Sequence, residues 1–598
     1  MVAILLHQPR YEIDKYFENN VALARIHLGL FNPEVQPSIS ADGKVATMID
    51  GKIFNYIGAQ DSSKQAGKEG MNDAEFCLSR YRENGLNFIN ELNGNFFIAL
   101  HDKEQNKVIF ANDRYGFRTH YFSYFKGNLL IAPEQKAILE FPGFKKELDE
   151  GGLAEFFAYG EFWGGKTLFK NISSIPPGSI LVFENGDLSM RRYWKPTFKP
   201  DRNKKEGEFV DALVTSYRQA VARRLEDNLR HGITLSGGLD SRSVIGAMPK
   251  EHRSKSIAFT FGDEESQEVR VAAMVVKESG ILKHVILGAS PELIIKNAER
   301  DAWLTDGALY IGLAFVYPLF EKISKDVDVI FDGYALDLTL GGSYLSKDKI
   351  GAKNRDELKA ILLKKRRFND EKMKQLLNRD LYERIKHVPD ESFEREFTAC
   401  TSEDMGNLSD EFAMNTHVAW MHVGDIAVRS QIEVAHPTSD NEFFDLLLTI
   451  PPELRFDHRL YRKWLKSLSP ELARIPYNHT MVRADAPIFL WHLGVKWNRV
   501  KEFAKKRIQI ATNNRILPRS KRSYVSYNEW LRTRKDWQDF FEGVLNSYPG
   551  LIERYLNREY ITKAFEEHKR GVQDHSMDLL YIATFILFLA AHFENEAS

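Results

Sequence analysis

A glycine-rich turn carries the clearest chemical signal in the chain. Residues 236–241 (SGGLDS) follow an apolar run at 233–235 that predicts a buried strand, and residues 242–248 suit a helix. A strand, a glycine-rich turn and a helix N-terminus together aim backbone N–H groups at an anion. Asp240 fits this cradle when Mg²⁺ lies between its carboxylate and a phosphate. We therefore expect the pyrophosphate of ATP to be bound by Leu235, Ser236, Gly237, Gly238, Leu239, Asp240 and Ser241.

The same turn resembles a known family. SGGLDS is similar to the pyrophosphate-binding loop of the asparagine synthetase and β-lactam synthetase superfamily, and it lacks the Walker pattern GxxxxGK[ST]. The resemblance implies an α/β synthetase domain of the adenine nucleotide α-hydrolase type, which uses ATP and Mg²⁺. A plain Gly-Gly turn between a strand and a helix is the alternative.

A second segment supplies a partner for Asp240. Residues 331–342 (FDGYALDLTLGG) resemble the family segment SGEGSDExxGG, which implies that Asp337 is the second Mg²⁺-binding aspartate. Two carboxylates and phosphate oxygens are ligands that this hard cation prefers. Taken alone, Asp337 also suits a helix cap or a surface position. The ends of the neighbouring predicted strands are expected to complete the ATP site, at Phe261, Asp332 and Gly333.

Tyr334 stands where asparagine synthetases carry a catalytic glutamate. In β-lactam synthetases a tyrosine at this place works with a glutamate to deprotonate an amine. A phenol needs such a carboxylate because its ordinary pKa is about 10. The glutamate position falls near Met421, and the nearest carboxylate is Asp425, one helical turn further on. We expect either a Tyr334–Asp425 base or a Tyr334 that only packs against substrate or adenine.

The lysine that holds the acyl-adenylate in the resembling enzymes has no counterpart here. Its place falls at about Tyr477, within the run RIPYNHT that begins at Arg474. Arg483 is close in sequence and is the candidate replacement cation, although its fixed charge and its reach differ from those of lysine.

The first 200 residues predict strands with polar turns, and they resemble the glutaminase domain of asparagine synthetases. The resemblance implies an αββα sandwich of the N-terminal-nucleophile type. Val2 occupies the place of the nucleophilic cysteine, Asp50 that of an oxyanion-hole asparagine, and His27 that of a glutamine-binding arginine, whereas Asp73 is retained. We therefore interpret residues 1–200 as a glutaminase-like domain that is inactive and structural.

A polar, proline-containing linker at residues 195–206 precedes the synthetase domain, which we place at residues 206–598. Strands and helices alternate up to residue 331 and predict a parallel sheet covered by helices. A helical part follows to the C-terminus. His568 and His575 have no cysteine or carboxylate at ligand spacing, so we interpret them as structural.

The net charge, the cysteine content and the longest apolar run limit the class of protein and its partners. The formal net charge is −1, which favours neither nucleic acid nor a membrane as the main partner. Cys77 and Cys400 are the two cysteines and are far apart, so a disulfide framework is not expected. The apolar run at 579–591 is too short for a bilayer span and predicts a buried helix. We expect a cytoplasmic protein, and a homodimer remains open.

Together these features predict an ATP-dependent ligase that forms AMP and pyrophosphate while joining a carboxylate to an amine or ammonia without hydrolysing glutamine. The carboxylate belongs to a small molecule, a peptide or a sugar. An ammonia-dependent asparagine synthetase, an intramolecular cyclase of the β-lactam or lasso type, and a non-catalytic ATP-binding scaffold are the alternatives.

Overall fold

The computed structural model describes residues 1–55, 71–418, 421–512 and 525–594. Its N-terminal part is built on a six-stranded antiparallel sheet with the order β11-β10-β6-β5-β4-β3. Helix α2 (Asp73–Asn84) packs on this sheet, and Asn72 and Glu75 form a capping box at its start. The strands are β3 (Ser38–Ile39), β4 (Val45–Ile53), β5 (Gly94–Asp102), β6 (Lys107–Asn112), β10 (Ser179–Glu184) and β11 (Asp187–Arg192).

Two smaller sheets form the second β-layer. They consist of the pair β1 (Glu12–Glu18) and β2 (Val21–His27), and of β8-β7-β9, which comprise Asn128–Ala132, Tyr121–Phe125 and Ser173–Ser174. Apolar side chains from both layers meet between them, among them Phe97, Phe110 and Leu181 from the large sheet with Leu129 and Ile131 from β8. The five-residue helix α3 (Gln135–Leu139) contacts β7 and β8. The helical layer over this sheet is therefore much thinner than the predicted αββα arrangement implies.

A five-stranded parallel sheet, with the order β14-β13-β12-β15-β16, organises the middle of the chain. After the central strand β12, the chain first forms β13 on one side of it and later forms β15 on its other side. The carboxyl end of β12 is therefore a topological switch point, where sheets of this kind bind ligands. The strands are β12 (His231–Thr234), β13 (Ile257–Phe261), β14 (Lys283–Leu287), β15 (Val329–Phe331) and β16 (Glu433–Ala435).

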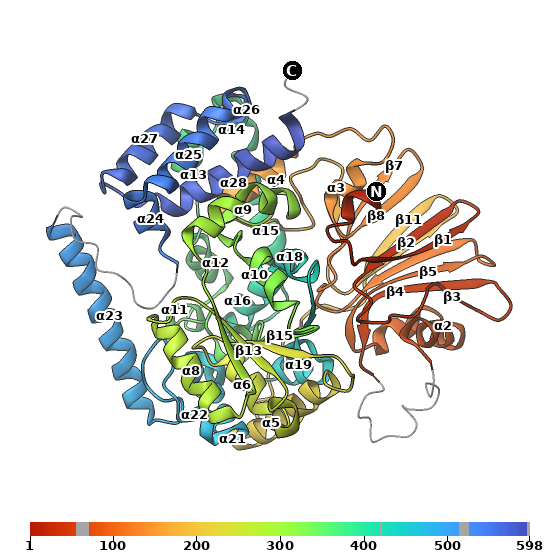
Figure 1. The fold of residues 1–598 in the computed structure, drawn as a ribbon, viewed down its shortest axis with the longest axis horizontal. Helices are drawn as coiled ribbons and strands as arrows, with labels where there is room; N and C mark the ends of the chain where they lie inside the picture. Colours follow the sequence, from red (N-terminus) through yellow and green to blue (C-terminus); the bar gives the residue numbers. More distant parts are fainter. Residues whose placement is uncertain (56–70, 419–420, 513–524, 595–598) are drawn as a thin grey trace.

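Helices surround this sheet and form a separate bundle toward the C-terminus (Figure 1). Among the described residues, one helix, α28 (Ser576–Phe593), is long and apolar enough to cross a membrane, but 78 % of it is buried inside the fold. It is the core of the bundle, as the apolar run at 579–591 predicts. Helix α4 (Glu150–Tyr159) belongs to the N-terminal 200 residues, yet it packs on α14 (Arg379–Ile385) and α15 (Val388–Ala399). One apolar core thus crosses the boundary at residue 200.

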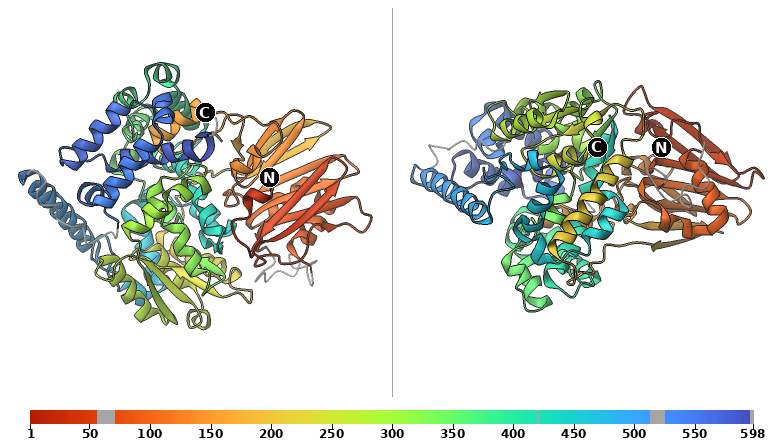
Figure 2. Two further views of the ribbon diagram at one scale, coloured as in Figure 1. Left: turned by 45° about the horizontal axis from the view of Figure 1, so that its top comes forward. Right: turned by 90° about the horizontal axis from the view of Figure 1, so that it is seen from below.

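Helix α23 (Ile488–Ala511) stands at the outside of the molecule, apart from the C-terminal bundle in Figure 1 and in the left view of Figure 2.

Candidate functional site: a carboxylate pair beside an anion loop

The predicted anion loop directly follows β12 and leads into helix α6 (Asp240–Ala247). The Ser236 hydroxyl accepts a hydrogen bond from the Gly238 N–H at 3.1 Å, and the Ser236 N–H donates to the Ser241 hydroxyl at 3.1 Å. Leu235 and Leu239 are buried in the core and fix the two ends of the loop. The sequence therefore predicts the strand, the turn and the helix correctly.

Arg242 connects this loop by hydrogen bonds to residues 475–476, which are far away in the sequence. Its buried guanidinium donates to the Gly238 and Gly237 carbonyls at 2.9 and 3.1 Å, and to the Ile475 and Pro476 carbonyls at 2.9 and 3.0 Å. Burial lowers the pKa of Arg242 to about 10. Asn478 adds a backbone N–H bond to the Gly237 carbonyl at 3.2 Å. Arg242 was not predicted as a site residue; a charged side chain in a helix that is otherwise buried is the signal for it.

Asp240 and Asp337 lie together at the carboxyl edge of the parallel sheet. The Asp337 N–H donates to the Asp240 Oδ2 at 3.1 Å, and the Tyr461 hydroxyl donates to the Asp240 Oδ1 at 2.6 Å. Burial, and then the charge of Asp337, raise the pKa of Asp240 well above its ordinary value. A Cβ atom at Gly333 would lie 2.7 Å from the Asp240 backbone carbon, so glycine is required where the two segments cross.

Asp337 is held in its ionised form by a histidine. The His458 Nε2 lies 2.8 Å from the Asp337 Oδ1. Burial works against ionisation of Asp337, but the contact with His458 outweighs it, so its pKa is lowered. A strongly acidic carboxylate beside a weakly acidic one is an arrangement that a divalent cation stabilises, because the cation removes their mutual repulsion. The described residues contain no cluster of three or more His, Cys, Asp or Glu side chains that could hold a metal, so phosphate oxygens would have to complete the coordination.

The backbone around this pair is strained. Ala335, inside the second motif, has φ +60°, and Asp457 and His458 have φ +56° and +59°. A side chain other than glycine in this region costs roughly 1–2 kcal/mol, and such strain concentrates at functional sites. Neither His458 nor Tyr461 was predicted, because each reaches the aspartates from a helix more than 100 residues away.

The other predicted ATP-site residues differ in placement. Asp332 follows β15 and is half-buried; desolvation raises its pKa, and the charge of Asp425 adds to the effect. The Phe261 ring packs on Phe315 and Phe320, with centroids 6.2 and 5.9 Å away, and is therefore a partly buried side chain at the edge of the apolar core.

The structure does not form a Tyr334–Asp425 hydrogen bond. The Tyr334 hydroxyl donates to the Val418 carbonyl at 3.0 Å, and the Asp425 carboxylate lies 3.4 Å from the His436 Nε2. Burial, and then the charge of Asp425, raise the pKa of Tyr334 well above its ordinary value. Burial opposes ionisation of Asp425, but His436 outweighs it and its pKa is lowered. His436 therefore occupies the place that the predicted dyad requires Tyr334 to take.

Arg483 and Tyr477, the two residues considered for the place of the missing lysine, lie at different distances from the carboxylate pair. The Arg483 side chain is 54 % exposed and donates to both oxygens of Asp485, at 2.8 and 2.7 Å. Tyr477 stacks on Trp491 at 5.3 Å, with the rings 5° from parallel, and lies 5.9 Å from the His458 ring. Tyr477 therefore stands beside the carboxylate pair, whereas Arg483 is engaged at the surface.

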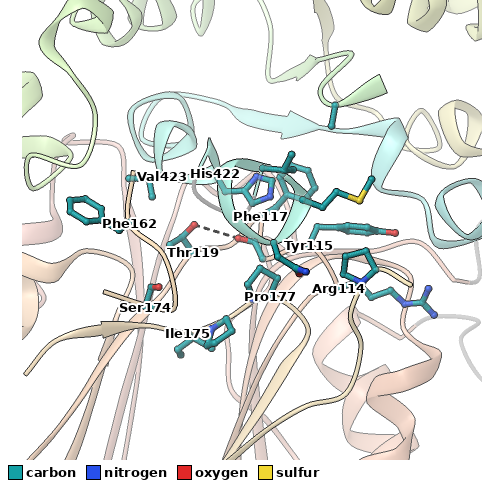
Figure 3. Close-up of a pocket in the computed structure, with 18 of the residues that line it drawn as sticks. Arg114, Tyr115, Phe117, Thr119, Phe162, Ser174, Ile175, Pro177, His422 and Val423 are labelled. Carbon is teal, nitrogen blue, oxygen red and sulfur yellow. Dashed lines mark hydrogen bonds between the residues drawn. The ribbon is translucent and has the colours of Figure 1, made fainter. Parts of the chain in front are cut away.

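A cavity of about 240 Å³ lies between the N-terminal sandwich and the α/β domain. Tyr334, Ala335 and Leu338 line it on the synthetase side, and Phe117 and Ile175 on the sandwich side. Figure 3 shows Phe117 and Thr119 near His422 in this cavity, with the Thr119 hydroxyl bonded to the Gly116 carbonyl. The lining is mostly apolar, so the cavity suits a ligand with an apolar body next to the strained second motif.

A second cavity, of about 260 Å³, is lined by His27 and Asp50, two of the positions that the glutaminase resemblance singles out. The Asp50 carboxylate faces it and accepts from Arg118 at 3.1 Å, while Arg118 also pairs with Glu433 at 2.6 Å. Burial, and then Arg25, lower the pKa of His27, so this side chain does not replace the permanent charge of an arginine.

The remaining glutaminase positions are Asp73 and Val2. The retained Asp73 accepts from the Asn32 side chain at 2.9 Å and from the Ile53 N–H at 3.0 Å. Val2 precedes a single 3-10 turn, η1 (Ala3–Leu5).

The two parts of the chain match two families. Residues 3–194 match the glutamine amidotransferase domain, and residues 213–592, more than half of the chain, match asparagine synthase. The chain therefore belongs to the asparagine synthase family, which confirms the resemblance of its motifs. Membership places it among the ATP-dependent amide ligases.

Similar proteins cover nearly all of the chain at low identity. Asparagine synthetase [glutamine-hydrolyzing] 1 of Bacillus subtilis is 22 % identical over 94 % of this chain and 88 % of its own length. A putative asparagine synthetase [glutamine-hydrolyzing] of Mycobacterium tuberculosis is 22 % identical over 93 % and 86 %. A match to a solved glutamine phosphoribosylpyrophosphate amidotransferase of B. subtilis is 12 % identical, covers 45 % of this chain and 67 % of that chain, and has a TM-score of 0.23.

Proposed function

We propose that this protein activates a carboxylate with ATP, releasing pyrophosphate, and transfers the acyl group to an amine that does not come from glutamine. The observation that supports it is the Asp240–Asp337 pair beside the anion loop after β12, at a contact of 3.1 Å. Asp240 and Asp337 would hold Mg²⁺, which supplies charge neutralisation for the polyphosphate when bound. The loop N–H groups, held in place by Arg242, would receive the departing pyrophosphate.

The step balances without any further reagent. A carboxylate oxygen of the substrate bonds to the α-phosphorus of ATP, and the bond from that phosphorus to the bridging oxygen of pyrophosphate breaks. The amine then attacks the acyl carbon, AMP leaves, and the amine loses one proton. The protein's task is mainly positioning and electrostatic stabilisation.

The glutamine-independent part of the proposal rests on the second cavity. A carboxylate at Asp50 would repel a developing oxyanion, and Arg118 holds this carboxylate in its ionised form, because the pKa of Asp50 is lowered despite burial. Val2 offers no thiol. The amine would instead occupy the apolar cavity beside Tyr334.

The test is exchange of labelled pyrophosphate into ATP in the presence of fractionated carboxylate pools, followed by mass spectrometry of the product. Exchange that requires Mg²⁺ and is lost in Asp240→Ala supports adenylation. The matched control is Asp263→Asn, an exposed aspartate in the turn before α8 (Gln267–Ser279). Formation of ADP in place of AMP would overturn the proposal.

Ammonia-dependent asparagine synthesis is the second candidate. The similar proteins are named asparagine synthetases [glutamine-hydrolyzing], which supports asparagine as the product, while Val2 in place of a cysteine supports ammonia as the nitrogen source. Ammonium and aspartate would then give asparagine, while glutamine would not replace ammonium. A product formed from a larger amine excludes this candidate.

A further inference from the structure

Helix α23 (Ile488–Ala511) presents an unpartnered apolar face to the outside of the molecule. Phe489, Leu493, Trp497, Val500 and Phe503 are each between 55 % and 60 % exposed. Their spacing of four, four, three and three residues places them on one side of an α-helix. At about 1.5 Å per residue, a helix of 24 residues presents this stripe over roughly 36 Å. A stripe this long, open and aromatic is unusual on a protein surface and indicates a docking face.

The opposite side of the helix is anchored to the body. Trp491 is 1 % exposed and stacks on Tyr477. A Cβ atom at Gly494 would lie 2.9 Å from the Thr480 carbonyl oxygen, so the helix backbone approaches that segment closely. His492 pairs with Asp457 at 2.5 Å. The first half of α23 is therefore fixed in orientation, and its apolar stripe is directed away from the fold.

Charge distinguishes the kind of partner. The sequence of α23 contains six Lys or Arg residues and one Glu, whereas the whole chain has a formal net charge of −1. Basic side chains lie next to the apolar stripe: the Lys501 ammonium is 5.4 Å from the Trp497 ring, and the Arg507 guanidinium is 5.0 Å from the Phe503 ring. An apolar, aromatic face flanked by Lys and Arg matches the boundary between lipid headgroups and acyl chains in an anionic bilayer.

We propose that α23 is an interfacial helix that docks this protein on an anionic membrane surface, with its stripe of Phe489, Leu493, Trp497, Val500 and Phe503 inserted among the lipids. This departs from the expectation of no membrane partner, which follows from the overall charge, because the charge is concentrated on one helix. It does not depend on the proposed reaction.

The proposed docking helix packs close to the Asp240–Asp337 carboxylate pair. Trp491, on the anchored side of α23, lies 5.8 Å from the ring of His458, the partner of Asp337. The helix that we propose to contact the lipid surface therefore also packs beside the histidine that pairs with Asp337.

The test is co-sedimentation of the full chain with vesicles of phosphatidylcholine alone and of phosphatidylcholine with phosphatidylglycerol. We expect at least tenfold stronger partition to the anionic vesicles, decreasing with salt. The variant Leu493→Ser/Trp497→Ser/Phe503→Ser should lose this partition. Its matched control, Phe17→Ser/Val35→Ser/Val572→Ser, replaces side chains that are at least 71 % exposed elsewhere and should bind as the wild type does.

A second variant separates the contribution of the basic side chains from that of the apolar stripe. Lys496→Gln/Arg499→Gln/Lys501→Gln should abolish the preference for anionic vesicles. Circular dichroism melts confirm that each variant is folded. The proposal is overturned by failure of the wild type to sediment with anionic vesicles, by equal binding of the apolar-face variant, or by a concentration-dependent dimer that this variant disrupts in the absence of vesicle binding.

Discussion

The backbone N–H of Asp337 donates to the carboxylate of Asp240 across 97 residues of sequence, at 3.1 Å. This contact joins the end of β12 to the segment after β15 and places two acids at one sheet edge. Burial and the charge of Asp337 raise the pKa of Asp240, while His458 keeps Asp337 ionised. The two carboxylates therefore repel each other, and a bound cation would remove this repulsion.

The first prediction follows from this repulsion. Asp240→Asn should reduce pyrophosphate exchange by about a hundredfold or more, because one of two charges that bind the cation is lost. The same change should stabilise the ligand-free protein, since it removes the repulsion between this carboxylate and Asp337. Wild-type protein should gain thermal stability from Mg²⁺ with a nucleotide, and the variant should gain much less. Thermal melts with and without the ligands measure both effects, and a ligand-free variant less stable than the wild type would contradict the prediction.

Arg242 provides the second prediction. Arg242→Lys keeps the charge but cannot reach the carbonyls of Gly237, Gly238, Ile475 and Pro476 at once. We expect a rise of about tenfold in the KM for ATP with a smaller change in kcat, because the loop loses its fixed shape. Arg253, which donates to the Gly246 and Met248 carbonyls away from the loop, offers the matched control Arg253→Lys. An unchanged KM for ATP in the Arg242 variant would show that the loop holds its shape without the clamp.

The sequence predicts the parts of this site that are local. An apolar run, two glycines and a following helix lie within twenty residues, so the strand, the loop and the start of α6 are all visible in the pattern. Asp337 was found because it belongs to a second recognisable motif. His458 and Tyr461 were missed because the segment that carries them, the turn at Phe456–His458 and the start of the following helix, joins the site through tertiary packing, which no local pattern encodes. The placement of α4 in the C-terminal bundle was missed for the same reason.

A buried acid outside the site gives the third prediction. Asp301 is 3 % exposed, and its Oδ2 has no hydrogen-bond partner among the described residues. Burial raises its pKa to about 8. The unfolded chain ionises near pH 4 while the folded protein stays protonated, so stability falls as the pH rises from about 4 to about 8.

Asp301→Asn removes this dependence, because the amide cannot ionise. At pH 8 we expect the variant to be more stable by roughly 2 kcal/mol after the cost of burying an amide, and its stability should change less between pH 5 and pH 8. Urea unfolding at several pH values measures both quantities, with the exposed-site variant Asp263→Asn as the control. If the stability of Asp301→Asn depends on pH as strongly as that of the wild type, a group other than Asp301 causes the pH dependence.

The last prediction separates two roles for Tyr334. Its hydroxyl donates to the Val418 carbonyl, while Asp425 is engaged by His436. In this geometry the ring shapes the cavity, packing edge-to-face with Phe117 at 5.6 Å and with His436 at 5.6 Å. Tyr334→Phe keeps the ring and removes only the hydroxyl, so we expect product formation to fall by less than about threefold, a loss in line with one neutral hydrogen bond. Asp425→Asn should cost more, because it leaves the buried His436 without its charged partner. A loss of about a hundredfold or more in Tyr334→Phe, with the alkaline limb of the pH–rate profile removed, would instead show that the phenol moves a proton in the reaction.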